Sequence, residues 1–113
     1  MRLENIINAL SLEVLQLQGD FHVEVSGGYA SDLLSDVIAR SRQKNIWITL
    51  QTHPNVIAVA KLKELAAIIF VNSRMPEDET LKKAREENVV LLRTEDSAFT
   101  ISGKLYALIT QKD

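Results

Sequence analysis

The chain opens with apolar side chains at helical spacing. Leu3, Ile6, Ile7 and Leu10 occupy the i, i+3, i+4 and i+7 positions, which predicts an amphipathic helix over residues 3–10. Residues 13–17 and 21–25 are apolar or β-branched enough for two short strands. Only Gln18-Gly19-Asp20 separates them, and so short a turn joins antiparallel neighbours. We therefore predict a hairpin after the first helix.

The pattern then changes to nearly continuous apolar runs that alternate with helical segments. Such runs are typical of strands that are buried on both faces of a parallel sheet, and they cover residues 46–50, 67–71 and 89–92. Segments with helical period lie around them at residues 31–41, 54–66, 77–87 and 97–110. The pattern predicts one α/β domain over residues 1–113. Its three layers, α/β/α, would enclose a mixed, mainly parallel sheet of about five strands, with right-handed crossovers.

Three of these helices differ in how apolar and charged side chains are distributed around them. The segment 54–66 is apolar around most of its circumference, so it should be deeply buried. The segment 77–87 is mostly charged and should lie on the surface. The last helix offers Phe99, Leu105, Tyr106 and Ile109 for packing, and Trp47 within a strand is expected in the core.

Composition and charge narrow the class of protein. The chain has 113 residues, of which 46% are apolar, and 13 Lys and Arg face 15 Asp and Glu, for a net charge of −2. The apolar content excludes disorder, and the length excludes a large multidomain enzyme. No basic run is present, so we expect no nucleic-acid partner. The longest apolar run, residues 65–71, is far too short to span a membrane, and residues 1–10 lack the apolar core of a signal peptide.

Several reaction types lack their sequence motifs. The chain contains no cysteine, no phosphate-binding P-loop, no dinucleotide-binding glycine motif, no zinc-protease motif and no nucleophile elbow. Two histidines at unrelated spacing do not make a metal site. We therefore expect no metal and no cofactor, and the absence of cysteine fits a cytoplasmic protein.

The loops at the carboxyl ends of the strands hold the candidate chemistry, because open α/β sheets bind ligands there. Gly27 and Gly28 lie between a predicted strand and a helix, where glycine permits positive φ and close approach of a phosphate or carboxylate to the helix start. The alternative is a plain turn in which Ser31 or Asp32 caps the helix. Asp32 would also repel an anion unless a cation or a hydroxyl intervened.

The next loops add imidazole, amide and guanidinium groups. His53, between Thr52 and the Pro54-Asn55 pair, is a candidate acid/base or phosphoryl ligand, although a histidine in such a turn more often bonds the backbone. Arg74 and Arg93 follow neighbouring strands and could reach one anion. Their alternative role is ion pairing with nearby carboxylates, namely Glu77, Glu95 or Asp96.

Three strings resemble stand-alone DRTGG domains: residues 25–36 (VSGGYASDLLSD), 46–60 (IWITLQTHPNVIAVA) and 103–106 (GKLY). The resemblance covers nearly the whole chain and implies the fold of the N-terminal domain of HPr kinase/phosphorylase. It also implies a regulatory or assembly role, commonly as a homodimer. The matching loop residues have no assigned role in the family: Gly27, Gly28, Ser31, Asp32, Thr52, His53 and Asn55. Where relatives often carry Gly-Gly after the fourth strand, this chain has Asn72-Ser73-Arg74, which puts ligand binding at that loop in doubt.

These observations favour a non-catalytic regulatory module. It would bind a small anionic metabolite or nucleotide, or a partner protein, as a homodimer and without membrane contact. A second hypothesis is an interaction scaffold that has no ligand. A third is an enzyme that uses His53 with Asp32 or Thr52, which requires those side chains to meet within hydrogen-bond reach.

Overall fold

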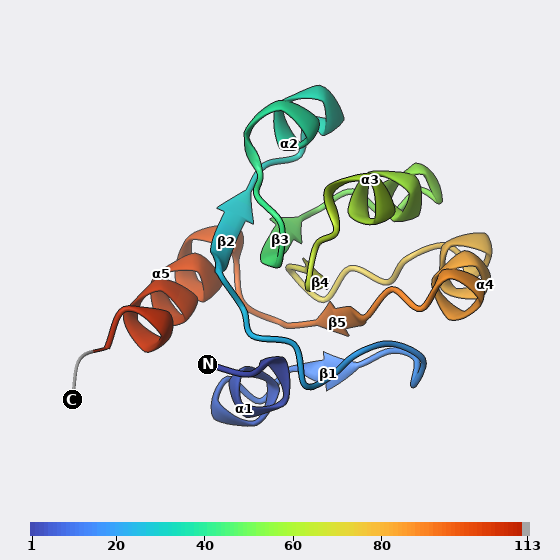
Figure 1. Cartoon of the computed structure of the whole chain (residues 1–113). Coiled ribbons are helices and arrows are strands. Elements are labelled where there is room, and N and C mark those ends of the chain that lie inside the picture. Colours follow the sequence, from blue (N-terminus) through green and yellow to red (C-terminus); the bar gives the residue numbers. More distant parts are fainter. Residues whose placement is uncertain (112–113) are drawn as a thin grey trace.

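The computed structural model describes residues 1–111, and its centre is a five-stranded sheet in the order β1-β5-β4-β3-β2 (Figure 1). The inner pairs β2–β3, β3–β4 and β4–β5 are parallel, and β1 joins β5 antiparallel. The predicted mixed, mainly parallel sheet of about five strands is therefore confirmed. The strands are β1 (Glu13–Val14), β2 (Gly27–Ala30), β3 (Asn45–Thr49), β4 (Ala67–Phe70) and β5 (Leu91–Arg93).

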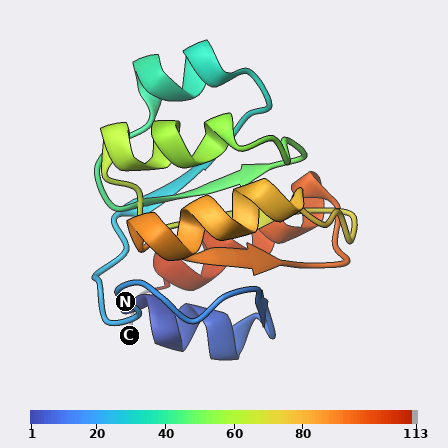
Figure 2. The same cartoon turned by 90° about the vertical axis from the view of Figure 1, so that its right-hand side faces the viewer.

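Helices cover both faces of this sheet (Figure 2). The crossovers α2, α3 and α4 lie on one face, and the two helices nearest the ends of the chain, α1 and α5, lie on the other. None of the helices within residues 1–111 combines the length and the apolar character needed to span a bilayer. Their bounds are α1 (Leu3–Ala9), α2 (Leu34–Arg40), α3 (Asn55–Lys63), α4 (Asp78–Glu87) and α5 (Ala98–Ile109).

The two central strands explain why both faces need helices. Every residue of β3 and β4 is buried. Along β3, Ile46 and Ile48 pack with α1 and α5, whereas Trp47 between them packs with the crossover helices. The indole of Trp47 donates to the carbonyl of Ser31 at 2.8 Å, so this large core side chain leaves no polar atom unpaired.

The hairpin predicted for residues 13–25 is wrong. β1 pairs with β5 instead, and Leu15 extends this contact by donating its N–H to Leu91 O at 2.9 Å. The side chain of Gln16 is buried and donates to the carbonyls of Gln18 and Val89, both at 2.6 Å. The Gly19 turn therefore docks on the segment before β5 rather than folding one strand back on the other.

Residues 21–25 were predicted as the second strand of that hairpin. They lie instead beside the first helix and accept hydrogen bonds from its start. The carbonyls of Phe21 and Val23 accept hydrogen bonds from Glu4 N and Leu3 N at 2.8 and 2.9 Å. The N–H groups of a first helical turn have no partner within the helix, so the extended segment supplies the acceptors that α1 would otherwise lack.

The second strand of the sheet begins where a loop was predicted. Gly27 and Gly28 lie inside β2, and neither has a positive φ. A Cβ on Gly28 would lie 3.0 Å from the end of the Leu105 side chain, so this glycine admits α5 against the sheet. The predicted glycine turn with positive φ is therefore wrong, because both glycines lie in a strand and Gly28 makes room for Leu105.

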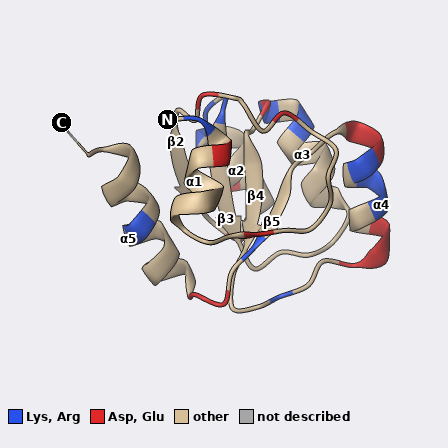
Figure 3. Ribbon diagram, turned by 90° about the horizontal axis from the view of Figure 1, so that it is seen from below, with Lys and Arg blue, Asp and Glu red and all other residues tan. Residues whose placement is uncertain are grey.

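Two of the four residues that were predicted to pack from the last helix do so. Leu105 is buried in the core and Ile109 packs against it, but Phe99 and Tyr106 lie 90% and 70% exposed. The charged helix α4 lies on the surface as predicted (Figure 3). The α3 helix buries four apolar residues against the sheet, but Leu62 is 67% exposed, so the deep burial predicted for residues 54–66 is confirmed for one side of the helix only.

A polar pair joins β2 to α2. The Tyr29 hydroxyl donates to Asp36 Oδ2 at 2.7 Å, and Arg40 Nε lies 3.6 Å from Asp36 Oδ1. The hydrogen bond from Tyr29, with a second from Ser31, lowers the pKa of Asp36, and the same hydrogen bond to Asp36 raises the pKa of Tyr29. The charged form of Asp36 is therefore favoured by the fold.

We expect Gly19→Ala to lower the free energy of unfolding by about 2 kcal/mol. Its φ is +139°, and an added Cβ would lie 2.6 Å from Val90 Cγ2. Gly27→Ala is the matched control, because its Cβ would meet only the Asn45 amide at 3.4 Å. Denaturant unfolding of both variants gives the comparison. Equal effects of the two substitutions would contradict the docked Gly19 turn.

We expect Tyr29→Phe to raise the pKa of Asp36 toward its ordinary value, because the largest cause of the lowering is removed. A lowered carboxyl pKa stabilises the fold above the unfolded pKa, and that contribution is lost as the pH falls through the folded pKa. The wild type should therefore exceed the variant in stability near neutral pH by more than it does in acid. NMR titration of the Asp36 carboxyl measures the pKa, with Tyr106→Phe as control. An unchanged pKa in Tyr29→Phe would contradict this account.

Candidate functional site

Strands β2 to β5 end at the same edge of the sheet, and the loops that follow them form what we call the strand-end rim. It consists of residues 31–33, 50–54, 71–77 and 94–97. Parallel strands bring their carboxyl ends together, and this edge is where open α/β sheets commonly bind ligands. The loops predicted to share this edge do so in part, because residues 27–30 of the first predicted loop form β2 and only the residues after them lie at the edge.

Asp32 ties the first loop to the second. Its Oδ1 accepts hydrogen bonds from Thr49 Oγ1 at 2.9 Å and from Leu50 N at 2.8 Å. The side chain of Gln51 returns a hydrogen bond to the Asp32 carbonyl at 2.8 Å. The carboxylate that would have repelled an anion is thus already engaged by two donors at the end of β3.

Thr52 ties the second loop to the third. Its carbonyl accepts from the buried Thr80 hydroxyl at 2.7 Å and from Glu77 N at 3.3 Å. Thr52 therefore acts through its backbone, and its contacts hold the start of α4 beside the start of α3.

The third loop reaches the fourth through an unusual turn. Asn72 and Ser73 both have positive φ, at 54° and 58°, and Arg74 N closes the turn on Val71 O at 3.0 Å. Asn72 N and Ser73 N donate to the carbonyls of Asp96 and Thr94, both at 2.9 Å. The backbone here adopts the conformation that glycine favours, although neither residue is glycine.

His53 is exposed, and its ring has a structural role. His53 Nδ1 accepts from Asn55 N at 3.1 Å, which pairs one of the N–H groups at the start of α3. This contact places the proton of the neutral ring on Nε2, which points away from that bond. Within residues 1–111, the hydrogen bonds of His53 include none to Asp32 or Thr52, which the enzyme hypothesis requires.

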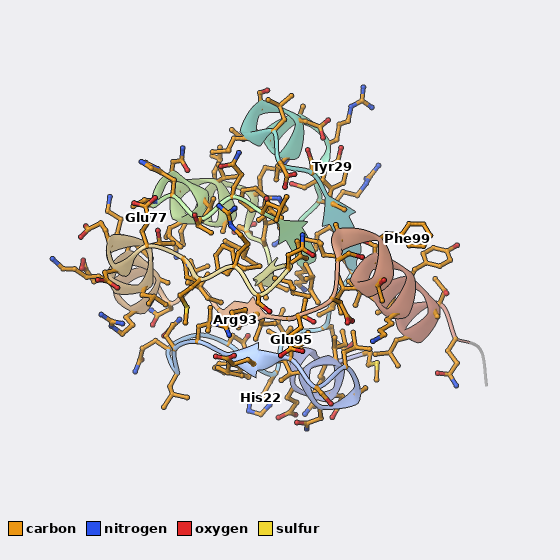
Figure 4. All side chains as sticks on the ribbon, turned by 180° about the vertical axis from the view of Figure 1, so that it is seen from behind. His22, Tyr29, Glu77, Arg93, Glu95 and Phe99 are labelled. Carbon is orange, nitrogen blue, oxygen red and sulfur yellow. The ribbon has the colours of Figure 1, made fainter. Side chains whose placement is uncertain are left out.

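The two candidate arginines differ in their surroundings. Arg93 is three-quarters buried, and its Nε lies 3.4 Å from Glu13 Oε1 on the neighbouring strand (Figure 4). The Met75 sulfur accepts a second contact from Arg93 at 3.8 Å. Arg74 lies exposed at the end of the Asn72–Ser73 turn, and the ion pairs of the described residues leave it without a carboxylate partner. Arg74 is therefore the cation that this rim leaves accessible.

The predicted glycine contribution to this site is not available. Gly27 and Gly28 lie in β2, and α2 begins only at Leu34 without a side-chain cap. Ser31 uses its hydroxyl to accept from Leu33 N at 3.2 Å. No group of three or more acidic or histidine side chains that could hold a metal ion occurs within residues 1–111.

A cavity lies between β2 and α5, apart from the strand-end rim, and the sequence pattern did not lead us to predict it. It is a mainly apolar cavity of about 220 Å³, with Gly28, Ala30 and Ile48 on the strand side. Ser102 lines it from α5, and the Ser102 hydroxyl is buried without a hydrogen-bond partner. The available signal was the alternation of the small residues Gly28 and Ala30 along one face of β2.

Comparison with protein-family models and with curated protein sequences finds no match. Among solved structures, the chain is similar to the crystal structure of the CBS and DRTGG domains of the regulatory region of Clostridium perfringens pyrophosphatase. That structure is complexed with the activator diadenosine tetraphosphate. The TM-score is 0.68 at 17% identity, and the match covers 92% of this chain and 45% of that chain.

This similarity concerns the fold. The present chain spans less than half of the matched regulatory region, and at 17% identity the residues of a site do not carry over. The arrangement of sheet and helices supports the DRTGG-like fold that the three sequence strings implied. The chain thus shares the fold of one part of that regulatory region.

Proposed function

We propose that this chain is a non-catalytic regulatory module, which binds a small anionic metabolite or nucleotide at the strand-end rim and works as a homodimer. The observation that supports ligand binding is the accessible guanidinium of Arg74, which follows a hydrogen-bonded turn. A guanidinium held on a fixed backbone pairs with a carboxylate or phosphate through two parallel hydrogen bonds.

The neighbours of Arg74 indicate what kind of anion fits. Thr52 joins the loops that carry Arg74 and His53, so the exposed side chains of His53 and Ser73 belong to the same part of the rim, and exposed Asn55 lies just beyond it at the start of α3. These side chains add hydrogen-bonding groups rather than positive charge. Glu77 is exposed in the same loop as Arg74. A ligand with one anionic group and several hydrogen-bonding groups suits this set better than a compact polyanion does.

The rim favours binding over catalysis. The carboxylate of Asp32, the carbonyl of Thr52 and the Nδ1 of His53 each hold a loop or a helix start in place. A general base needs a lone pair directed at substrate, whereas Asp32 Oδ1, Thr52 O and His53 Nδ1 each direct one at the protein. The similarity to the regulatory region of a pyrophosphatase, which was solved with a nucleotide activator, supports the regulatory class.

A protein-interaction scaffold is the second candidate function. The exposed aromatic rings of Phe99 and Tyr106 favour it, because they leave apolar surface that a protein partner could cover. In that case the rim would be only a set of braced loops.

We expect a thermal-shift screen to reveal a ligand among nucleotides (including diadenosine tetraphosphate), acyl phosphates and phosphosugars. A ligand at a hundred times its Kd adds about 2.7 kcal/mol of stability. Arg74→Ala should weaken binding by at least about tenfold, because it removes a charge-assisted hydrogen bond. Arg42→Ala is the matched control, because Arg42 is exposed between α2 and β3, away from the rim. A flat screen, or equal loss in both variants, would favour the scaffold.

We expect His53→Ala to lower the free energy of unfolding by about 1 kcal/mol, because it removes an acceptor at a helix start. His53→Asn should restore most of this loss, since an asparagine side chain also accepts from the backbone two residues on. Denaturant unfolding of the two variants provides the measurement. Full stability of His53→Ala would contradict the structural role and return weight to an acid/base role.

A further inference from the structure

The outward flank of α5 carries two aromatic side chains that the rest of the chain leaves largely uncovered. Phe99 and Tyr106, seven residues apart, are 90% and 70% exposed, and Figure 4 shows Phe99 pointing away from the body of the molecule. Ser102 and Gly103 lie between them, and these four residues with Ala30 line one shallow hollow. We call Phe99, Ser102, Gly103 and Tyr106 the α5 face.

Apolar exposure is concentrated at this end of the sheet. Of the eight large apolar side chains that the described residues leave exposed, Leu33 and Ile38 belong to the α2 region and two belong to α5. These helices lie on opposite faces of the sheet beside β2 (Figure 1). β2 is an edge strand, so one side of its backbone has no strand neighbour. An unpaired strand edge between two apolar surfaces is typical of a protein interface.

Charge favours a second copy of the same chain as the occupant. Lys104 is the one charged residue in α5, and its ammonium is held by Asp96 at 2.9 Å. Figure 3 shows acidic and basic segments along much of α4, whereas α5 is tan apart from a short blue segment. In a two-fold contact the residues nearest the axis meet their own counterparts, so the centre of a self-association surface must be free of like charges. The α5 face meets that requirement.

The order of residues along the face is also self-complementary. In an antiparallel crossing of two α5 helices centred on Ser102 and Gly103, Phe99 of one copy lies opposite the partner's Tyr106. Nothing lies within 4 Å of a Cβ added at Gly103, so within its own chain this glycine has open space where a second helix can approach. Aromatic pairs in such contacts contribute beyond their area.

We propose that two copies of this chain associate through the α5 face, with their α5 helices antiparallel and crossing at Ser102 and Gly103. This assignment rests on the homodimer of the proposed function and names its surface. Two aromatic side chains per copy bury on the order of 150 Å² each, or about 600 Å² in total. A specific interface needs about 1,200 Å², so the edge of β2 must lie inside the contact as well.

Sedimentation velocity across a hundredfold range of micromolar concentration tests the surface. We expect a wild-type dimer, and a dimer Kd raised about 30-fold or more in Phe99→Glu, because the variant removes an aromatic ring from the contact and places a charge against the partner's Tyr106. Leu62→Glu is the matched control, since Leu62 is 67% exposed on α3, on the other side of the sheet. It should remain a dimer. A monomeric wild type, or a Phe99→Glu dimer of unchanged affinity, would overturn the proposal.

A cysteine cross-link tests the crossing point independently of affinity. The chain has no cysteine, so Gly103→Cys introduces a single thiol near the two-fold axis, and Leu62→Cys introduces one away from it. Mild oxidation should yield a covalent dimer of Gly103→Cys only. Equal cross-linking of both variants would overturn the proposed crossing.

The two parts of the proposed function fail separately. The thermal-shift screen on Phe99→Glu reports ligand binding without the dimer, because Phe99 lies outside the rim. A monomeric wild type that still binds a ligand would overturn the dimer alone.

Discussion

The burial of β3 and β4 on both faces is the constraint on which the rest of the structure depends. Three crossover helices cover one face of these strands, because each parallel connection requires one. The opposite face has to be covered by the two ends of the chain, and α1 and α5 do so. Two helices do not cover five strands completely. The cavity beside β2 and the exposed flank of α5 lie where that cover ends.

The same arrangement connects the rim to the α5 face. The Asn72–Ser73 turn donates to the carbonyls of Thr94 and Asp96, just before α5 begins. The Asp96 carboxylate also accepts a hydrogen bond from Lys104, which lies within α5. A ligand bound to Arg74 would contact a turn whose backbone is hydrogen-bonded to the segment just before α5, the helix of the proposed dimer contact. Coupling would follow only if the ligand binds one state of that segment more tightly than another.

The sequence predicted the parts of the fold that depend on continuous burial. The runs at residues 46–50 and 67–71 became β3 and β4 within a residue, because a strand covered on both faces has few alternatives. The prediction of a hairpin at residues 13–25 failed because apolar and β-branched residues there are equally consistent with other partners. Gln16 and Gly19 dock on the segment before β5, and the carbonyls of residues 21 and 23 serve α1. Such choices depend on long-range contacts that no local pattern contains.

The candidate site was predicted by location and missed in its details. Topology alone brings four loops to one edge, but whether a polar side chain there is free depends on contacts between loops. Asp32, Thr52 and Arg93 turned out to be engaged, whereas Arg74 is accessible. Likewise, the spacing of Phe99 and Tyr106 in α5 looks the same whether the rings meet the core or a partner.

The strings that resemble DRTGG domains have a structural explanation in this chain. Gly28 admits Leu105, the Ser31 carbonyl accepts from Trp47, and Asp32 closes the end of β3. Residues with such roles fix the fold without fixing a ligand, which agrees with a shared fold at 17% identity. The Asn72-Ser73-Arg74 loop departs from the family pattern, yet it keeps a backbone that glycine would favour. A non-glycine residue in this backbone conformation costs about 1 kcal/mol or more per position. The side chain at such a position therefore provides a group that glycine lacks. The proposed ligand specificity therefore belongs to the loop where this chain differs from the DRTGG pattern that it otherwise resembles.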